Sequence, residues 1–309
     1  MVINQVRQIN KEDLLQSKFD IVIMASGYES RASYLASILN INTDCKKIVL
    51  SFQNYKETQE RTKNDELYSK LNYEPVECKE NESNLIIDIL NEFIIKSSIE
   101  KLSILIDYSS MTRVWYSAII NFLNEYETKK TLNVYYVYSS AKFYPPSSDE
   151  SKILNFSPID GFCNLSIPSN PTALITALGY EKNKAYGLRE YFDAQEMYLF
   201  LTVDNKFTTI VQERNNDLIL SIPESNCIQY NLNDLLYTKS ILYDLCLKLK
   251  DDYRIIIAPC GPKPFTLLSF LVASSLKMID IWRISGIDQH SERKASGNLL
   301  SLEVTYNVE

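Results

Sequence analysis

The sequence predicts an α/β protein made of two tandem parallel-sheet domains that are related by internal duplication. The stretch FDIVIMASGYESRASYLASIL at 19–39 returns as TALITALGYEKNKAYGLREYF at 172–192, and in both an apolar run leads into Gly-Tyr-Glu. The glycines of the two copies, Gly27 and Gly179, are 152 residues apart. A second pair of motifs, at Asp107 and Pro259, has the same offset of 152. Similarity at a fixed spacing indicates a duplicated unit.

Strands and helices alternate along the first half. A polar lead-in contains a strand at 2–9, and the apolar run at 19–25, rich in Ile and Val, is typical of a buried parallel strand. Ala32, Leu35, Ala36 and Leu39 then follow at helical spacing. Further strands are predicted at 48–52, around Val76, and at 102–106, 132–140 and 153–156, and further helices at 56–71, 85–95 and 112–126. This alternation predicts a Rossmann-like parallel sheet with helices on both faces.

The second half repeats the same order. The apolar run KIVLSF at 47–52 falls opposite YLFLTV at 198–203, an offset of 151, and the strand around Val76 falls opposite the one around Ile228. The polar segments at 141–152 and 287–298 are expected to be equivalent loops. Pro168 and Pro171 mark a linker at 166–170. We therefore expect one domain at 1–168 and a second at 169–309, each near the usual domain size of roughly 150 residues.

The composition argues against several classes of protein. A net charge of −7 does not suit binding to duplex DNA, which needs a basic surface. No apolar run reaches the roughly 18 residues of a membrane span, and the N-terminal segment lacks the apolar centre of a signal peptide, so we expect a cytoplasmic protein with no membrane contact. The six cysteines form no CxxC pair and are expected to be reduced thiols. His290 is the one histidine, so we expect no metal site and no cofactor.

The candidate ligand site lies beyond the carboxyl ends of the strands, where an open parallel sheet binds ligands. Hydroxyl groups and free backbone N–H groups at the start of the helix near residue 112 suit an anion, and the lysine of Gly-Pro-Lys-Pro supplies a point charge. Residues of the first half expected to contact the ligand are Gly27, Tyr28, Arg31, Ser109, Ser110, Thr112 and Arg113. Those of the second half are Gly179, Tyr180, Glu181, Gly261, Lys263 and Arg283.

Glycine is scarce in this chain, with seven in all, and four of them follow predicted strands. These are Gly27, Gly179, Gly261 and Gly286. Their placement indicates that backbone geometry matters at those turns, and that Gly261 lets the backbone approach a phosphate. Further contacts at the rim of the site are expected from Ser285, His290, Arg293 and Lys294.

Glu29 and Asp107 are the candidate catalytic residues, because both follow strands of the first half and both have an arginine nearby in the sequence, Arg31 and Arg113. Such a carboxylate pair could serve cleavage of a glycosidic or phosphodiester bond of a nucleotide, with the arginines holding phosphate. Structural roles are the alternative: Asp107 would form a salt bridge or cap a loop, and Glu29 would complement a helix dipole. Likewise, Ser or Thr before a helix is an ordinary N-cap.

The motifs IDYSSMTR and IAPCGPKPFTLLSFLVA, each a strand, a small-residue loop with Arg or Lys, and a helix, resemble the loop motif of CARF (CRISPR-associated Rossmann fold) domains. The resemblance covers two loops in each half. It implies a module that senses a nucleotide or an oligonucleotide across a two-fold interface. Such sensors dimerise and carry an effector domain. Because no effector segment remains here, the resemblance implies a protein partner, and a homodimer is a further expectation.

Two functions are therefore expected from the sequence. The first is a non-catalytic sensor or regulatory protein of a prokaryotic defence or signalling system, which binds a phosphorylated nucleotide in the cleft between the two halves. The second is a nucleotide hydrolase or N-glycosidase that uses Glu29 and Asp107. Binding without turnover would support the first function, and turnover would support the second.

Overall fold

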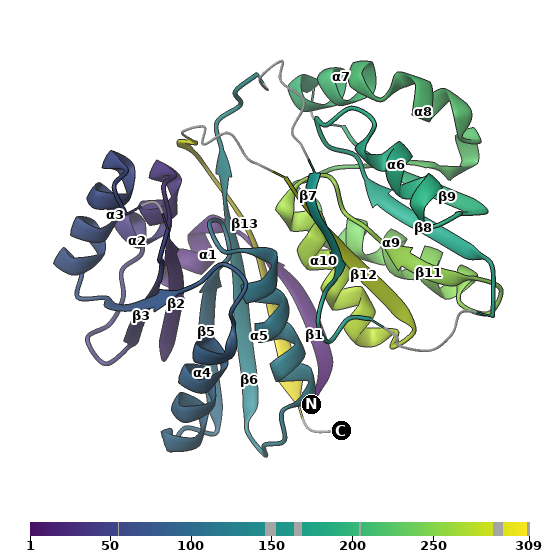
Figure 1. The fold of residues 1–309 in the computed structure, drawn as a ribbon. Coiled ribbons are helices and arrows are strands. Elements are labelled where there is room, and N and C mark those ends of the chain that lie inside the picture. Colours follow the sequence, from purple (N-terminus) through teal and green to yellow (C-terminus); the bar gives the residue numbers. More distant parts are fainter. Residues whose placement is uncertain (55, 146–152, 164–168, 204, 287–292, 308–309) are drawn as a thin grey trace. The chain divides into compact units, whose positions relative to one another are not determined.

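The computed structural model describes residues 1–54, 56–145, 153–163, 169–203, 205–286 and 293–307. The chain forms two compact units: unit 1 comprises residues 1–144 and 290–309, and unit 2 comprises residues 145–289. Each unit contains one mixed, mostly parallel sheet with helices on both faces (Figure 1). The predicted α/β class with two Rossmann-like sheets is therefore confirmed.

Unit 1 contains a seven-stranded sheet in the order β1-β13-β6-β5-β2-β3-β4. The strands are β1 (Val2–Ile9), β2 (Ile21–Ser26), β3 (Lys46–Phe52), β4 (Glu74–Cys78), β5 (Lys101–Asp107), β6 (Thr131–Ala141) and β13 (Ala295–Asn307). The helices are α1 (Lys11–Gln16), the 3-10 turn η1 (Ser30–Ser33), α2 (Tyr34–Ile38), α3 (Gln59–Lys70), α4 (Asn84–Lys96) and α5 (Arg113–Glu125).

Unit 2 contains a six-stranded sheet in the order β10-β9-β8-β11-β12-β7. The strands are β7 (Ile153–Pro158), β8 (Thr172–Ala177), β9 (Glu196–Thr202), β10 (Cys227–Tyr230), β11 (Arg254–Ile257) and β12 (Ile279–Gly286). The helices are α6 (Lys184–Tyr191), α7 (Asn205–Arg214), α8 (Asn216–Ser221), the 3-10 turn η2 (Glu224–Asn226), α9 (Leu235–Leu249) and α10 (Lys263–Ser275).

The two sheets have the same topology. From β13, the strands of unit 1 run β13-β6-β5-β2-β3-β4, and from β7 those of unit 2 run β7-β12-β11-β8-β9-β10. Each strand of one series therefore has a counterpart in the other, and β1 is an addition at the edge of the first sheet. Counting the parallel strands alone, the strand order of each sheet reverses between the first and the fourth, which are β2 and β5 in unit 1 and β8 and β11 in unit 2. This reversal defines the switch point of a Rossmann-like sheet.

The two units differ from the predicted domains 1–168 and 169–309, because they exchange their antiparallel strands. β13, near the C-terminus, pairs with β6 and β1 in unit 1, whereas β7 pairs with β12 in unit 2. In the sequence, β7 follows β6 and β13 follows β12. In the structure, however, β7 pairs with β12 and β13 pairs with β6. The predicted loop at 287–298 is also shorter than expected, because β13 already begins at Ala295. Residues 166–168 of the predicted linker lie outside the described residues.

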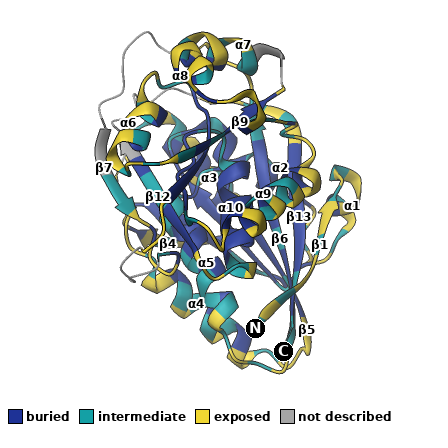
Figure 2. Cartoon of the chain, turned by 90° about the vertical axis from the view of Figure 1, so that its right-hand side faces the viewer, coloured by how far each residue is buried: buried dark blue, intermediate teal, exposed yellow. Residues whose placement is uncertain are grey.

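The core of each unit lies between its sheet and its helices, and Figure 2 shows the strands mostly buried and the outer helix surfaces exposed. All six residues of β2 are buried, as are all six of β8, because helices cover both faces of the central strands. On one face of unit 1, Leu14 of α1, Leu35 of α2 and Tyr68 of α3 pack on Val22 and Met24 of β2.

The six cysteines are free thiols. None of the described helices is long and apolar enough to cross a bilayer.

Candidate functional site

The Gly-Tyr-Glu turn of unit 1 leaves β2 and enters η1, and Arg31 fixes it from within. The Arg31 side chain is 1% exposed. Its Nε donates to Oε2 of Glu29 at 2.6 Å, and its Nη1 donates to the hydroxyl of Tyr138 at 2.9 Å. Nη2 donates to the backbone carbonyl of Ser109 at 3.4 Å. Arg31 therefore ties the turn after β2 to β6 and to the loop after β5.

Electrostatics keep this guanidinium charged. Burial lowers the pKa of Arg31, but Tyr138 and Glu29 beside it raise that pKa by more, so it lies above its ordinary value. The guanidinium also lies 5.2 Å from the centre of the Tyr138 ring, within the range of a cation–π interaction. Arg293, two residues before β13, approaches the other Glu29 oxygen at 3.6 Å. Arg31 is therefore placed to organise the turn from the interior.

Asp107 ends β5 and holds the loop that follows. Its Oδ1 accepts hydrogen bonds from the backbone N–H of Ser109, at 3.0 Å, and from the Ser109 hydroxyl. The same hydroxyl accepts a bond from the backbone N–H of Ser139 at 2.7 Å. Asp107 is 1% exposed and Glu29 is 9% exposed. The two predicted catalytic carboxylates thus belong to one buried network, joined through Arg31 and Ser109.

The predicted anion site before α5 is built largely from local structure. The Thr112 hydroxyl accepts a hydrogen bond from the Trp115 backbone N–H at 3.2 Å and donates to the Glu80 carbonyl at 3.0 Å. This is an N-cap, which was the alternative expected for a threonine at this position. Arg113 is the first residue of the helix, and Ser110 lies across from Gly27, 3.8 Å from where a Cβ on that glycine would stand. Tyr28, also expected to contact the ligand, is half-buried in the turn before η1.

In unit 2 the two equivalent turns pack directly against each other. The backbone N–H of Cys260 donates to the Ala177 carbonyl at 3.0 Å. A Cβ on Gly179 would collide with the backbone carbonyl of Cys260, and one on Gly261 would lie 2.8 Å from the carbonyl oxygen of Leu178. Packing between the two turns therefore accounts for the absence of a side chain at both Gly179 and Gly261.

The other predicted residues of unit 2 also make contacts within the unit. Glu181 pairs with Lys184 at 3.2 Å, and the ring of Tyr180 meets that of Phe207 edge-on at 4.7 Å. Arg283, on β12, donates to the Ser157 hydroxyl of β7 at 3.1 Å. Lys263 begins α10 directly after the capping residue Pro262. His290 lies outside the described residues, and so does the side chain of Ser285.

A buried asparagine that the sequence analysis missed holds the turn in each unit. Asn64 of α3 donates through Nδ2 to the carbonyls of Gly27 and Glu29, both at 2.9 Å. In unit 2, Asn215 donates in the same way to the carbonyl of Gly179 at 3.1 Å. Asn64 and Asn215 are 151 residues apart, the offset already seen for the neighbouring strands. The duplication could therefore have identified both residues.

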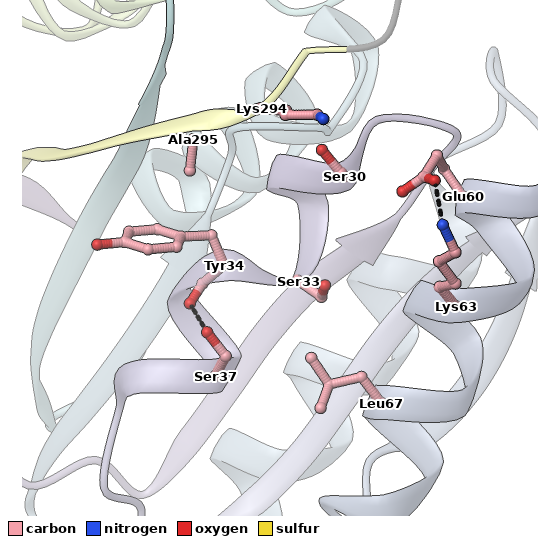
Figure 3. Close-up of a pocket in the computed structure, with 9 residues that line it drawn as sticks. All are labelled: Ser30, Ser33, Tyr34, Ser37, Glu60, Lys63, Leu67, Lys294 and Ala295. Atoms are coloured by element: carbon pink, nitrogen blue, oxygen red, sulfur yellow. Dashed lines mark hydrogen bonds and ion pairs between the residues drawn. The ribbon is translucent and has the colours of Figure 1, made fainter.

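A hollow of about 420 Å³ opens beside this turn in unit 1 (Figure 3). Its residues come from η1, α2, α3 and the start of β13: Ser30, Ser33, Tyr34, Ser37, Glu60, Lys63, Leu67, Lys294 and Ala295. Lys63 pairs with Glu60 at 2.6 Å across one turn of α3. Figure 3 shows the amino group of Lys294 and the hydroxyl of Ser30 near each other at one end. The hollow is therefore lined by hydroxyl groups, two ammonium groups and one carboxylate.

Tertiary contacts fix two walls of the hollow. The Ser33 hydroxyl donates to Oδ1 of Asn64 at 2.6 Å, and the Tyr34 hydroxyl donates to the Gly297 carbonyl at 3.4 Å. The Lys294 carbonyl accepts a bond from the Lys142 backbone N–H at 2.7 Å, which anchors the end of β13. Within the described ranges, no three His, Cys, Asp or Glu side chains group closely enough to hold a metal ion. The chemistry of this hollow favours an anionic, hydroxyl-bearing ligand.

Comparison with known proteins gives no family. No family model matches the chain, and no curated protein matches it. Among solved structures it is similar to the cytoplasmic domain of a prokaryotic cation chloride cotransporter, with 9% identity and a TM-score of 0.23 over 87% of this chain and 95% of that chain.

Proposed function

We propose that the protein is a non-catalytic nucleotide sensor or regulatory protein, and that unit 1 binds a phosphorylated nucleotide in the hollow beside the Gly-Tyr-Glu turn. The observation that carries this proposal is the lining of the hollow, which combines Lys63 and Lys294 with three serine hydroxyl groups beside an aromatic ring. Its volume of about 420 Å³ lies within the roughly 300–1,000 Å³ typical of small-molecule sites.

Each lining group suits one part of a nucleotide. The ammonium groups of Lys63 and Lys294 are compact charges that bind phosphate oxygens, and the Ser30 hydroxyl can donate to the same oxygens. Glu60 is an acceptor for the hydroxyl groups of a ribose, and the ring of Tyr34 offers an aromatic surface to a base. A role in defence or signalling is supported by the resemblance of the loops in both halves to CARF domains.

The geometry favours binding over catalysis. A hydrolase or N-glycosidase that used Glu29 and Asp107 would need both carboxylates to reach a substrate. Glu29 is 9% exposed and is paired with Arg31, and Asp107 is 1% exposed and accepts two bonds from Ser109. These contacts explain both carboxylates as supports for the turns, so the sensor is the function that we propose.

The first test is a titration of the full chain with AMP, ATP, cyclic di-AMP and cyclic tetra-adenylate. We expect at least one of them to bind and to raise the unfolding temperature, without product formation. Lys63→Gln and Lys294→Gln should each weaken that binding by about tenfold, since each removes one charge-assisted contact. Isothermal titration calorimetry gives the affinity, and chromatography of the nucleotides reports any product.

Lys70→Gln is the matched control, because Lys70 is an exposed lysine of the same helix that does not line the hollow. It should leave the affinity unchanged. If none of the four nucleotides binds, or if binding survives in the Lys63→Gln/Lys294→Gln double variant, the proposed site is wrong. Turnover that Glu29→Gln or Asp107→Asn abolishes would establish the enzyme instead.

A further inference from the structure

Unit 2 has a hollow of its own, between the start of α6 and helices α7 and α8. Its volume is about 80 Å³. Its lining includes Lys182, Tyr186, Arg214, Asp217, Leu218 and Ser221. Like the hollow of unit 1, it combines two cationic side chains and one carboxylate with a tyrosine, a leucine and a serine.

The lining residues of the two hollows correspond through the duplication. Ser30 corresponds to Lys182 and Tyr34 to Tyr186, both at an offset of 152. On the next helix the offset is 151: Lys63 corresponds to Arg214 and Leu67 to Leu218. These are the offsets of the neighbouring strands and turns, so the same structural positions line both hollows. The helix after β3 in unit 1 therefore supplies the cation Lys63, and the helix after β9 in unit 2 supplies the cation Arg214.

Tertiary contacts hold Arg214 at this position. Its Nη1 donates to the Tyr180 carbonyl at 3.1 Å, so the guanidinium is anchored to the Gly-Tyr-Glu turn of unit 2. Asn215, next to it, holds the same turn through the carbonyl of Gly179. Lys182 lies in that turn and its side chain is exposed. A planar guanidinium next to an ammonium group is well suited to the oxygens of a phosphate.

We infer that this hollow is a second anion site, which takes inorganic phosphate or one terminal phosphoryl group, and that Lys182 and Arg214 bind the anion. Its volume of about 80 Å³ is below the range of sites that enclose a whole nucleotide. Asp217, which also lines the hollow, disfavours further negative charge, and this limits the site to a small anion. The inference goes beyond the function proposed for unit 1, because this site can bind whether or not that one does.

The experiment uses the full chain and two probes. Crystals soaked in tungstate, a heavy analogue of phosphate, would show an anomalous peak between Lys182 and Arg214. In solution, sodium phosphate should raise the unfolding midpoint of unit 2, which Trp282 fluorescence follows in a Trp115→Phe background. Lys182→Gln should weaken this response by about tenfold, and Arg214→Gln by at least as much.

Lys182→Gln is informative even if Arg214→Gln fails to fold, because Lys182 is exposed, and Arg214→Lys, which keeps the charge, should retain part of the response. The control is Lys248→Ala/Lys250→Ala, which removes two exposed charges from unit 2 away from the hollow. The inference is overturned if phosphate raises the unfolding midpoint of unit 2 equally in wild type, control and Lys182→Gln. It is also overturned if tungstate density appears at other positions but not between Lys182 and Arg214. Density in the hollow of unit 1 alone overturns this inference and leaves the proposed function standing, because the nucleotide titration tests that function separately.

Discussion

Gly27 and Gly179 occupy equivalent turns, yet their surroundings differ. A Cβ on Gly27 would lie 3.5 Å from the ring of Phe52, an ordinary contact, and the φ angle of Gly27 is not one that disfavours other residues. A Cβ on Gly179 or Gly261 would press against backbone carbonyl groups of the opposite turn. In unit 2, glycine is therefore required at positions 179 and 261 because the two turns pack too closely for a side chain.

Alanine substitutions should distinguish Gly27, where a Cβ has room, from Gly179 and Gly261, where a Cβ would meet backbone atoms. We expect Gly179→Ala and Gly261→Ala to lower the free energy of unfolding by about 1–3 kcal/mol or more, because backbone atoms cannot move aside easily. Gly27→Ala should change it by less than about 1 kcal/mol. Urea unfolding of the full chain, followed by circular dichroism and by Trp282 fluorescence, measures this. Equal losses at all three positions would contradict the packing argument.

At the level of single elements, the turn after β2 in unit 1 and the turn after β8 in unit 2 are each held by an asparagine that comes later in the chain. Asn64 of α3 satisfies two carbonyls of the turn in unit 1, and its own Oδ1 accepts from Ser33. Asn64 is 2% exposed, so these carbonyls have little access to water in its place. The asparagine thus connects α3 to η1 and shapes the hollow between them.

Removing this asparagine should loosen the turn. We expect Asn64→Ala to destabilise the protein by about 1–3 kcal/mol, the cost of leaving buried polar groups unpaired. Asn215→Ala should have a similar effect on unit 2. Nucleotide affinity should also fall in Asn64→Ala, since the walls of the hollow lose their support. Urea unfolding and calorimetric titration give the two quantities.

Asn42→Ala is the control for this pair, because Asn42 is exposed and a surface substitution changes stability by only about 0.5 kcal/mol. An unchanged unfolding midpoint in both asparagine variants would show that the turns hold their shape without the amide groups.

For the whole molecule, the exchange of β7 and β13 makes each unit depend on a segment from the other half of the sequence. Leu302 and Val304 of β13 are fully buried in unit 1, although they belong to the second half of the duplication. Phe156 of β7 packs on Trp282 in unit 2, with ring centres 4.8 Å apart. The two sequence repeats are therefore not the two structural units.

The two tryptophans, Trp115 in unit 1 and Trp282 in unit 2, allow this exchange to be tested. Leu302→Ala should lower the stability of unit 1 by about 2–5 kcal/mol, as large-to-small substitutions in cores do. In a Trp282→Phe background, the unfolding midpoint reported by Trp115 should fall. Phe156→Ala should instead lower the midpoint reported by Trp282 in a Trp115→Phe background. A loss of stability in the opposite unit would mean that the strands are not exchanged.

The α/β class, the duplication and most strands and helices could be predicted from the amino-acid sequence, because these follow from apolar periodicity and from a constant offset. The strands at 196–202 and 227–230 lie where the repeat placed them, and the helix at 113–125 lies where one was expected after the strand at 102–106. The sequence also identified Thr112 as a capping candidate, since a cap depends only on neighbouring residues.

The folded structure was needed to show which sheet each antiparallel strand joins, because β6 and β12 offer similar edges and pairing is a contact between residues far apart in the chain. It also decided the role of the charged motif residues. Arg31, Glu29 and Asp107 look like ligand contacts in the sequence, but burial and hydrogen bonding turn them inward. The hollow that we propose as the site combines Lys63 of α3 with Lys294 beside β13, and 231 residues of chain separate them. Folding alone brings such distant charges together.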